Sequence, residues 1–239
     1  RYQLAKDNQF LKYSRYAIGE IVLVVVGILI ALQINNWQQN RKNDEARRNY
    51  YHQLLHDLEK DRILIEGFLL EIDSFEVRLQ SYKEIFKQPD LPIWQITNEM
   101  RKVFLSDGVN VKVNNNAITT LQNTGDIKLI PPLVRNKILD FKYKQAGIMD
   151  FVSITQQNIV NHTLHLSELW GGDLVGRSEN QPKLVKHYND ENIQIQSLMG
   201  LEANLSTLSE ALKKVEKRFK DLLKDAEEIT KIINQELKK

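Results

Sequence analysis

One apolar run dominates the N-terminal part of the chain. No residue from Ile21 to Leu32 is polar, and apolar character extends over residues 17–34 with only Glu20 and Gln33 interrupting it. A run of this length approaches the roughly 20 residues that cross a bilayer as a helix. The alternative is a buried core helix of a soluble protein, but the run has no polar face to present to water. The pattern therefore predicts a transmembrane helix over residues 16–37.

Side chains suited to a membrane interface flank this run. Tyr13 and Tyr16 precede it, Trp37 follows it, and Arg15 and Arg41 stand where long cationic side chains can reach lipid headgroups. These five residues are predicted to anchor the helix at the interfaces, so membrane lipid is the first partner that the sequence indicates. The preceding residues 1–15 form a juxtamembrane segment, either a short amphipathic surface helix or a frayed tail.

Small side chains share one face of the predicted span at intervals of four residues, with Leu23 as the single bulky interruption. Such a stripe lets two helices approach closely, which indicates a transmembrane partner contact through Gly19, Gly27, Ala31 and Asn35. Glu20 belongs to the same prediction, because a carboxylate one turn inside the hydrocarbon needs a partner or access to the interface. The alternative for Glu20 is that it reaches headgroup level or pairs with Arg15 or Tyr16.

The N-terminal part resembles the hallmark of a family of uncharacterised single-span membrane proteins, common in Bacteroidota and described only as a domain of unknown function. The resemblance is carried by the run RYAIGEIVLVVVGILIALQINNW, and it is close over about Tyr13–Lys42. It implies a cell-envelope protein without a known activity. Members begin with a short basic leader after the initiator Met, so the resemblance also implies further residues before Arg1.

The charges around the span do not decide its orientation. Four basic residues precede the span and four follow it closely, namely Arg1, Lys6, Lys12 and Arg15, then Arg41, Lys42, Arg47 and Arg48. No small-residue cleavage site follows the apolar run, which indicates an uncleaved signal-anchor. The basic leader that the resemblance implies favours a cytoplasmic N-terminus, an inner (cytoplasmic) membrane location and a periplasmic domain over residues 38–239.

Beyond the span, apolar residues follow alternating steps of three and four, which is the heptad pattern of packed helices. A first such helix is predicted over residues 44–88, in direct continuation of the span, with Asp61 in a core position and with Pro89 and Pro92 ending it. Its predicted core consists of Leu54, Leu58, Ile65, Phe68, Ile72, Phe75, Leu79, Tyr82 and Phe86.

Shorter elements are predicted in the middle of the chain. A helix is expected over residues 93–105, and residues 109–114 alternate apolar and polar side chains, as a lone strand or a loop would. A further helix is expected over residues 116–123, capped by the asparagines Asn114–Asn116 and ended by Gly125.

A second long heptad helix begins at Pro131 and Pro132 and ends at Gly171, because proline is tolerated in a first helical turn. Its polar heptad positions are Gln145, Thr155 and His162, which in such patterns commonly fix register. Its apolar core positions are Val134, Ile138, Phe141, Ile148, Val152, Ile159, Leu166 and Leu169.

The C-terminal part contains the most regular pattern of the chain. A loop is predicted over residues 173–189, followed by a short helix that Asp190 caps and that ends at Met199. A last helix is predicted from Leu201, with a core of Leu201, Leu205, Leu208, Leu212, Val215, Phe219, Leu222, Ala226, Ile229 and Ile233.

The predicted fold class is all-α, with one N-terminal transmembrane helix that continues into an extramembrane antiparallel helical bundle of long heptad helices. Only 10 Gly and 5 Pro occur among 239 residues, which favours long uninterrupted helices. The three heptad helices are expected to alternate in direction, so that the first rises from the bilayer, the next descends and the last rises again.

The composition excludes several chemical functions. The chain has no cysteine, which excludes disulfides, Cys-ligated clusters and thiol catalysis, and its net charge of +2 gives no sign of a nucleic-acid partner. His52 and His56, one helical turn apart, could ligate a metal together with His162 and His165, but such pairs arise easily on heptad helices. No phosphate-binding loop or nucleophile elbow occurs. We therefore predict no cofactor, no metal and no enzymatic activity.

Two functions fit this architecture. The first is a structural or accessory subunit of a cell-envelope complex, forming a homo-oligomer or a larger assembly through helix contacts and through exposed aromatic residues such as Phe10, Trp94, Phe104 and Trp170. The second is a periplasmic sensor bundle that binds a ligand and signals through a partner protein. A pocket lined by Gln145, Thr155 and His162 would favour the sensor.

Overall fold

The computed structural model describes residues 2–104, 116–170 and 181–238, and these residues form two compact units, 1–52 and 53–239. Within the described residues all regular structure is helical, which confirms the predicted all-α fold class. The predicted residues 109–114, the asparagines Asn114 and Asn115, and the predicted helix end at Gly171 lie outside the described ranges.

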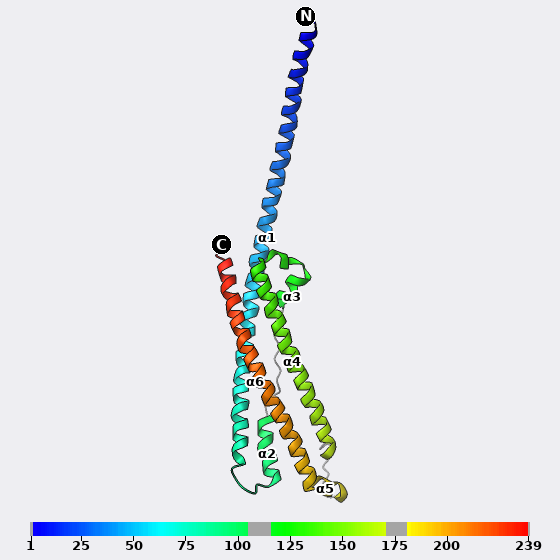
Figure 1. Cartoon of the computed structure of the whole chain (residues 1–239), viewed down its shortest axis with the longest axis vertical. Helices are drawn as coiled ribbons and strands as arrows, with labels where there is room; N and C mark the ends of the chain where they lie inside the picture. The colour runs from blue at the N-terminus through cyan, green and yellow to red at the C-terminus, as the bar shows by residue number, and fades with distance from the viewer. Residues whose placement is uncertain (1, 105–115, 171–180, 239) are drawn as a thin grey trace. The chain divides into compact units, whose positions relative to one another are not determined.

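The first unit consists of helix alone. It belongs to α1 (Tyr2–Ile85), which also contributes its C-terminal part to the second unit (Figure 1). The residues predicted to form the membrane span, 16–37, are all helical and all exposed. Their β-branched and aliphatic side chains therefore find no protein to pack against within the described chain.

The second unit combines the end of α1 with five further α-helices and one short 3₁₀ helix. In chain order these are α2 (Ile93–Phe104), α3 (Asn116–Asn123), η1 (Asp126–Leu129), α4 (Pro132–Trp170), α5 (Pro182–Tyr188) and α6 (Glu191–Glu236). The predicted starts of α2, α3 and α4 agree with the structure to within one residue. Gly125 follows α3 with a φ of 75°, a left-handed conformation that suits glycine at the end of a helix.

The core of the second unit lies where α1, α4 and α6 pack against one another. Most predicted heptad core residues are buried, and Ile159, Leu169, Leu201 and Leu208 are half-buried. The rings of Phe68 and Phe219 meet edge to face with centroids 5.6 Å apart. Phe86 is the clear exception. It is exposed because α1 ends at Ile85, one residue before it.

The first turn of α3 is held by a side chain from α1. The backbone N–H of Ala117 donates to Asp57 Oδ2 at 2.8 Å, which satisfies one of the amide groups that a helix leaves free at its N-terminus. The negative charge of Asp57 also lies at the favourable end of the α3 dipole. This contact fixes α3 to the second unit independently of the predicted asparagine cap.

The helix directions differ from the predicted alternation. Along α1 and α6 the contacts run in opposite order, since Phe68 packs on Phe219 whereas Tyr82, further along α1, donates to Glu202. The contacts of α4 with α6 also run in opposite order, from Lys137 with Glu228 to His162 with Asn204.

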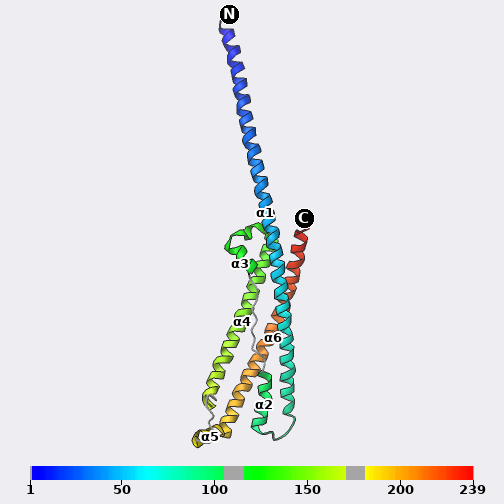
Figure 2. The same cartoon turned by 180° about the vertical axis from the view of Figure 1, so that it is seen from behind.

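Both α1 and α4 are thus antiparallel to α6, and they are parallel to each other, as both views of the second unit show (Figures 1 and 2). The expected descent of the second heptad helix was therefore wrong. The physical reason is that α2 lies at the end of the second unit where α1 ends, whereas α3 and the start of α4 lie at the opposite end.

Two further predictions in the C-terminal part are corrected. Residues Pro182–Tyr188 form α5 inside the predicted loop 173–189. Asp190 caps a helix as expected, with its carboxylate accepting from the N–H of Asn192 at 2.9 Å, but this helix does not end at Met199 and runs on to Glu236 as α6. Gly200 lies inside the continuous helix α6. At this position Leu166 of α4 leaves no room for a side chain.

An alanine comparison tests this role of Gly200. A Cβ at Gly200 would lie 2.3 Å from Leu166 Cδ2, whereas a Cβ at Gly147, an exposed position of α4, would meet nothing within 4 Å. Gly147→Ala is expected to raise the unfolding free energy by about 0.5–1 kcal/mol through helix propensity alone. The unfolding free energy of Gly200→Ala is expected to be roughly 1–2 kcal/mol lower than that of Gly147→Ala, because Leu166 must move.

The measurement is denaturant unfolding of the full chain in detergent, followed by circular dichroism. Leu166→Ala combined with Gly200→Ala serves as the control, because the smaller side chain removes the clash at its source. Equal stabilisation by the two single alanine substitutions would show that Gly200 is not a close-packing position.

Candidate functional site

The candidate membrane anchor is the apolar part of α1. Within the described residues, α1 is the one helix that is long and apolar enough to cross a membrane, and none of its most apolar stretch is buried by protein. A core helix of a soluble protein would be mostly buried, so the exposure of this run in the described chain argues against that alternative. These properties support membrane anchoring by length and composition.

The residues of the predicted transmembrane contact lie on this exposed helix. A Cβ added at Gly19 or Gly27 would meet nothing within 4 Å, so neither glycine is required by packing within the described chain. Glu20, Ala31 and Asn35 are likewise exposed. The structure thus leaves the whole stripe open, and its role in a partner contact stays a prediction.

The predicted interface anchors are partly described. Tyr16 and Trp37 are exposed, and the Arg41 guanidinium lies 6.0 Å from the centre of the Trp37 ring, at the outer limit of a cation–π contact. An aromatic ring and a cation on one turn suit a headgroup layer, since each has an apolar body and a polar end. The side chains of Tyr13 and Arg15 lie outside the described part.

Polar residues inside the second unit pair with one another. Asp61 and Gln145, both predicted at core positions, are buried, and Gln145 Nε2 donates to Asp61 Oδ2 at 2.7 Å. This bond joins α1 to α4 at one level of the core. A buried amide and carboxylate that must meet penalise any axial shift of one helix along the other, which is how such pairs fix register.

A second polar level joins α4 to α6. His162 Nδ1 lies 2.5 Å from Asn204 Oδ1, and Asn204 Nδ2 donates to Thr163 Oγ1 at 3.0 Å. Asn204 is buried, whereas His162 is exposed beside it. The sequence analysis missed Asn204, although its spacing of three from Leu201 and four to Leu208 places it beside the heptad positions.

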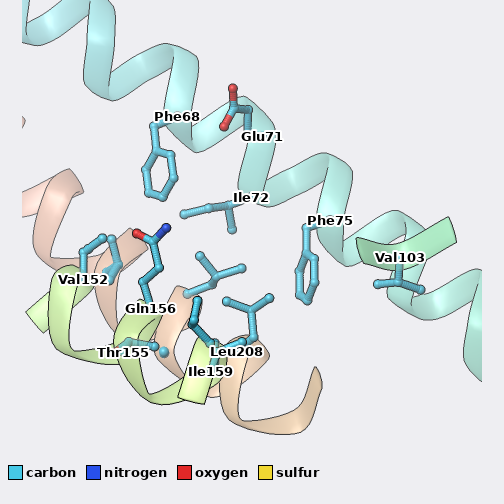
Figure 3. Close-up of a pocket in the computed structure, with 14 residues that line it drawn as sticks. Phe68, Glu71, Ile72, Phe75, Val103, Val152, Thr155, Gln156, Ile159 and Leu208 are labelled. Carbon is cyan, nitrogen blue, oxygen red and sulfur yellow. The ribbon is translucent and has the colours of Figure 1, made fainter. Parts of the chain in front are cut away.

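Thr155, the third predicted polar position, borders an apolar cavity between α1, α2, α4 and α6 (Figure 3). The cavity holds about 230 Å³, and rings and aliphatic side chains of α1 point into it, opposite Val152, Ile159 and Leu208. Thr155 Oγ1 donates to the carbonyl of Phe151, which satisfies its hydroxyl within α4. Neither Gln145 nor His162 lines the cavity, so the three polar residues do not form one pocket.

The chemistry available at the cavity is that of an apolar binding site. Among its lining residues, Glu71 carries the one charge and Gln156 the one amide, and both are exposed at its edge. Such a lining can hold an apolar molecule by burial. Elsewhere in the described chain no three His, Asp or Glu side chains gather as a metal would require, and His52 and His56 are exposed.

Tyr82 and Glu202 form a further contact between α1 and α6. The buried phenol donates to Glu202 Oε1. Burial first, and then the hydrogen bond and negative charge of Glu202, raise the pKa of Tyr82 well above its ordinary value. The neutral phenol is therefore the form that the folded bundle requires.

A double-mutant cycle tests the Asp61–Gln145 pair. Gln145→Leu is expected to lower the unfolding free energy by about 1–3 kcal/mol, because Asp61 loses a buried donor. Asp61→Leu with Gln145→Leu is expected to be closer to the wild type than the sum of the two single changes. Additive single effects, measured by denaturant unfolding of the full chain in detergent, would show that the bond does not couple the helices.

The raised pKa of Tyr82 predicts a loss of stability in alkali. The unfolded chain loses this proton above about pH 10, whereas the folded chain keeps it, so the contribution of Tyr82 to the unfolding free energy is constant below about pH 10 and falls above it. The unfolding free energy of the Tyr82→Phe variant is expected to fall less steeply above about pH 10, because phenylalanine has no phenolic proton to lose. The measurement is the difference in unfolding free energy between Tyr82→Phe and wild type at pH 7 and above pH 10. A difference independent of pH would contradict the prediction.

Comparison with known proteins finds a family model that is similar to part of the chain. Residues 20–132, which run from within the apolar stretch of α1 to the first residue of α4, match the model of a family of unknown function (DUF6090). No curated protein and no solved structure matches the chain. The chain is thus similar, from residue 20 of α1 through α2, α3 and η1, to a family whose function is itself unknown.

Proposed function

We propose that this chain is a non-enzymatic, membrane-anchored structural or accessory subunit of a cell-envelope complex that acts through helix–helix contacts. The observation that carries this proposal is the exposed apolar stretch of α1, residues 16–37. Exposed aliphatic side chains in such a continuous run are stable only in lipid or against other apolar helices.

The proposed location is the inner (cytoplasmic) membrane, with a cytoplasmic N-terminus and residues 38–239 in the periplasm. The support is the resemblance of residues 13–42 to a single-span family common in Bacteroidota, together with the family match over residues 20–132. Lipid contacts of Tyr13, Arg15, Tyr16, Trp37 and Arg41 belong to the same proposal.

The proposed contact within the membrane is formed by Glu20 and the small residues at 19, 27, 31 and 35. The support is that the described chain leaves both glycines uncovered, so their small size serves no packing inside the chain. Trp94, which is exposed on α2, is a candidate contact outside the membrane. The side chains of Phe10, Phe104 and Trp170 lie outside the described part.

A ligand-sensing bundle is the alternative, and the apolar cavity beside Thr155 is the observation that favours it. The accessory role remains our first proposal. Its support is that two of the three polar core residues take part in contacts between helices and do not face the cavity. A sensor of this kind would also require a partner protein to transmit its signal.

The test is native mass spectrometry of the full chain, solubilised in nanodiscs directly from its own membrane. We expect this chain together with stoichiometric amounts of at least one other envelope protein. Gly27→Leu is expected to reduce recovery of that assembly at least roughly tenfold, because a large side chain separates the helices. Val25→Leu, on the opposite side of the helix, is the matched control and is expected to have no effect.

Recovery of this chain without any foreign subunit would contradict a stable accessory role. In that case the bundle would be tested for binding of an apolar fluorescent probe, with Ile159→Trp as the variant that fills the cavity. Recovery of the chain in the soluble fraction would contradict the membrane anchor itself.

A further inference from the structure

α1 carries a second apolar pattern within the second unit, on the face opposite its core residues. Large aliphatic side chains recur every seven residues at Ile63, Leu70 and Val77, and they are 57%, 68% and 68% exposed. Small exposed residues recur between and after them, at Gly67, Ser74 and Ser81. These six residues, which we call the outer seam, alternate steps of four and three as the positions of a helix-packing surface do.

Packing within the described chain does not explain the outer seam. A Cβ at Gly67 would meet nothing within 4 Å, yet glycine inside a helix costs about 0.5–1 kcal/mol relative to alanine. The hydroxyls of Ser74 and Ser81 donate to the carbonyls of Leu70 and Val77 at 2.9 and 3.0 Å. Both serines are therefore compact and already satisfied, so a second helix can cover them without leaving a buried donor unpaired.

We propose that the outer seam is a self-association surface, which pairs in parallel and in register with the outer seam of a second copy. This inference rests on the proposed function for one step, because copies inserted into one membrane by the same N-terminal helix enter it in the same direction. Leu70 and Val77 of one copy would then contact Leu70 and Val77 of the other. The small residues between them would let the two helices approach closely.

The charges beside the outer seam favour the parallel arrangement. In a parallel heptad pair, the residue before a small seam position faces the residue five places further along the other helix. Asp73 therefore faces Arg78 of the second copy, and symmetry forms this ion pair twice. Arg78 is half-buried in the single chain, and its covered Nε has no hydrogen-bond partner among the described residues.

One pair of like charges also meets in the parallel arrangement. Glu66 would face Glu71 of the second copy, which is unfavourable. The charge of Glu66 is already compensated within its own chain, because Arg62 Nη1 donates to both of its carboxylate oxygens at 2.8 and 2.9 Å. The net effect of the flanking charges is therefore attractive.

The antiparallel arrangement of the same two seams is disfavoured by the same residues. Reversing one helix brings Asp73 against Asp73 and Glu71 against Glu71 of the second copy, and it removes both ion pairs with Arg78. Like charges at flanking positions of a helix pair select against that orientation.

The test uses the absence of cysteine from the chain. The full chain is expressed in its own membranes with a single Leu70→Cys or Val77→Cys substitution and exposed to a mild oxidant. We expect a disulfide-linked homodimer for each, because the same seam position of two parallel helices lies within disulfide reach. Tyr143→Cys, on an exposed position of α4, is the matched control and is expected to give at least about tenfold less dimer.

Charge variants give a second readout that a chance collision would not reproduce. Asp73→Lys in the Val77→Cys background is expected to lower dimer yield, because it places two cations together. Adding Arg78→Asp restores opposite charges and is expected to recover the yield. Leu70→Glu in the same background is expected to abolish the dimer without loss of helical content, because Leu70 is mostly exposed in the single chain.

Several outcomes would overturn the proposal. Equal dimer yields from Leu70→Cys and Tyr143→Cys would show non-specific collision. A stronger crosslink between coexpressed Ile63→Cys and Ser81→Cys chains would show antiparallel pairing, and a disulfide from Leu70→Cys to a different protein would show another occupant. Membrane fractionation of the same samples reports separately on the proposed function, since a soluble chain refutes the anchor whatever its crosslinks.

Discussion

Burial of three heptad faces against one another is the constraint on which the second unit depends. α1, α4 and α6 each expose a polar surface and bury an apolar one, and the contact between the rings of Phe68 and Phe219 lies within that shared interior. The short helices are arranged around this core. α2 covers one part of it through Met100 and Val103, and α3 is fixed beside it by Asp57.

Apolar burial alone does not determine how three heptad helices align along their length, because Leu, Ile and Phe can exchange neighbours at modest cost. Polar side chains supply the missing specificity. Asp61 with Gln145, and Asn204 with His162 and Thr163, hold two levels of the bundle at fixed positions. A cavity remains between these levels and α2, where apolar side chains of four helices do not fill the space completely.

The sequence predicted the helices of this protein better than their arrangement. Heptad spacing identified most buried residues of α1, α4 and α6, because one repeating step sets which side of a helix faces the core, but it missed Tyr51, Leu198, Asn204, Ser209 and Ala211. It did not predict that α4 runs parallel to α1, since direction depends on where connecting segments lead. It also predicted two helices, one ending at Met199 and one beginning at Leu201, where α6 is continuous and Leu166 packs closely against Gly200.

Of the candidate sites, the apolar span was evident from composition, and its small-residue stripe stays a prediction. The polar core residues Asp61 and Gln145 were visible as exceptions in an apolar pattern, but only the structure pairs them. The outer seam was present in the sequence as a seven-residue interval of Ile63, Leu70 and Val77. It was missed because the stronger core pattern of the same helix concealed it.

The parallel course of α1 and α4 has a mechanical consequence. Because α6 is antiparallel to both, its C-terminal end lies at the end of the second unit where α1 enters it (Figure 2). A pulling force applied between these two ends would peel α6 from α1 turn by turn, beginning at that end, and would not shear the whole interface at once. Such a bundle resists load weakly along that line.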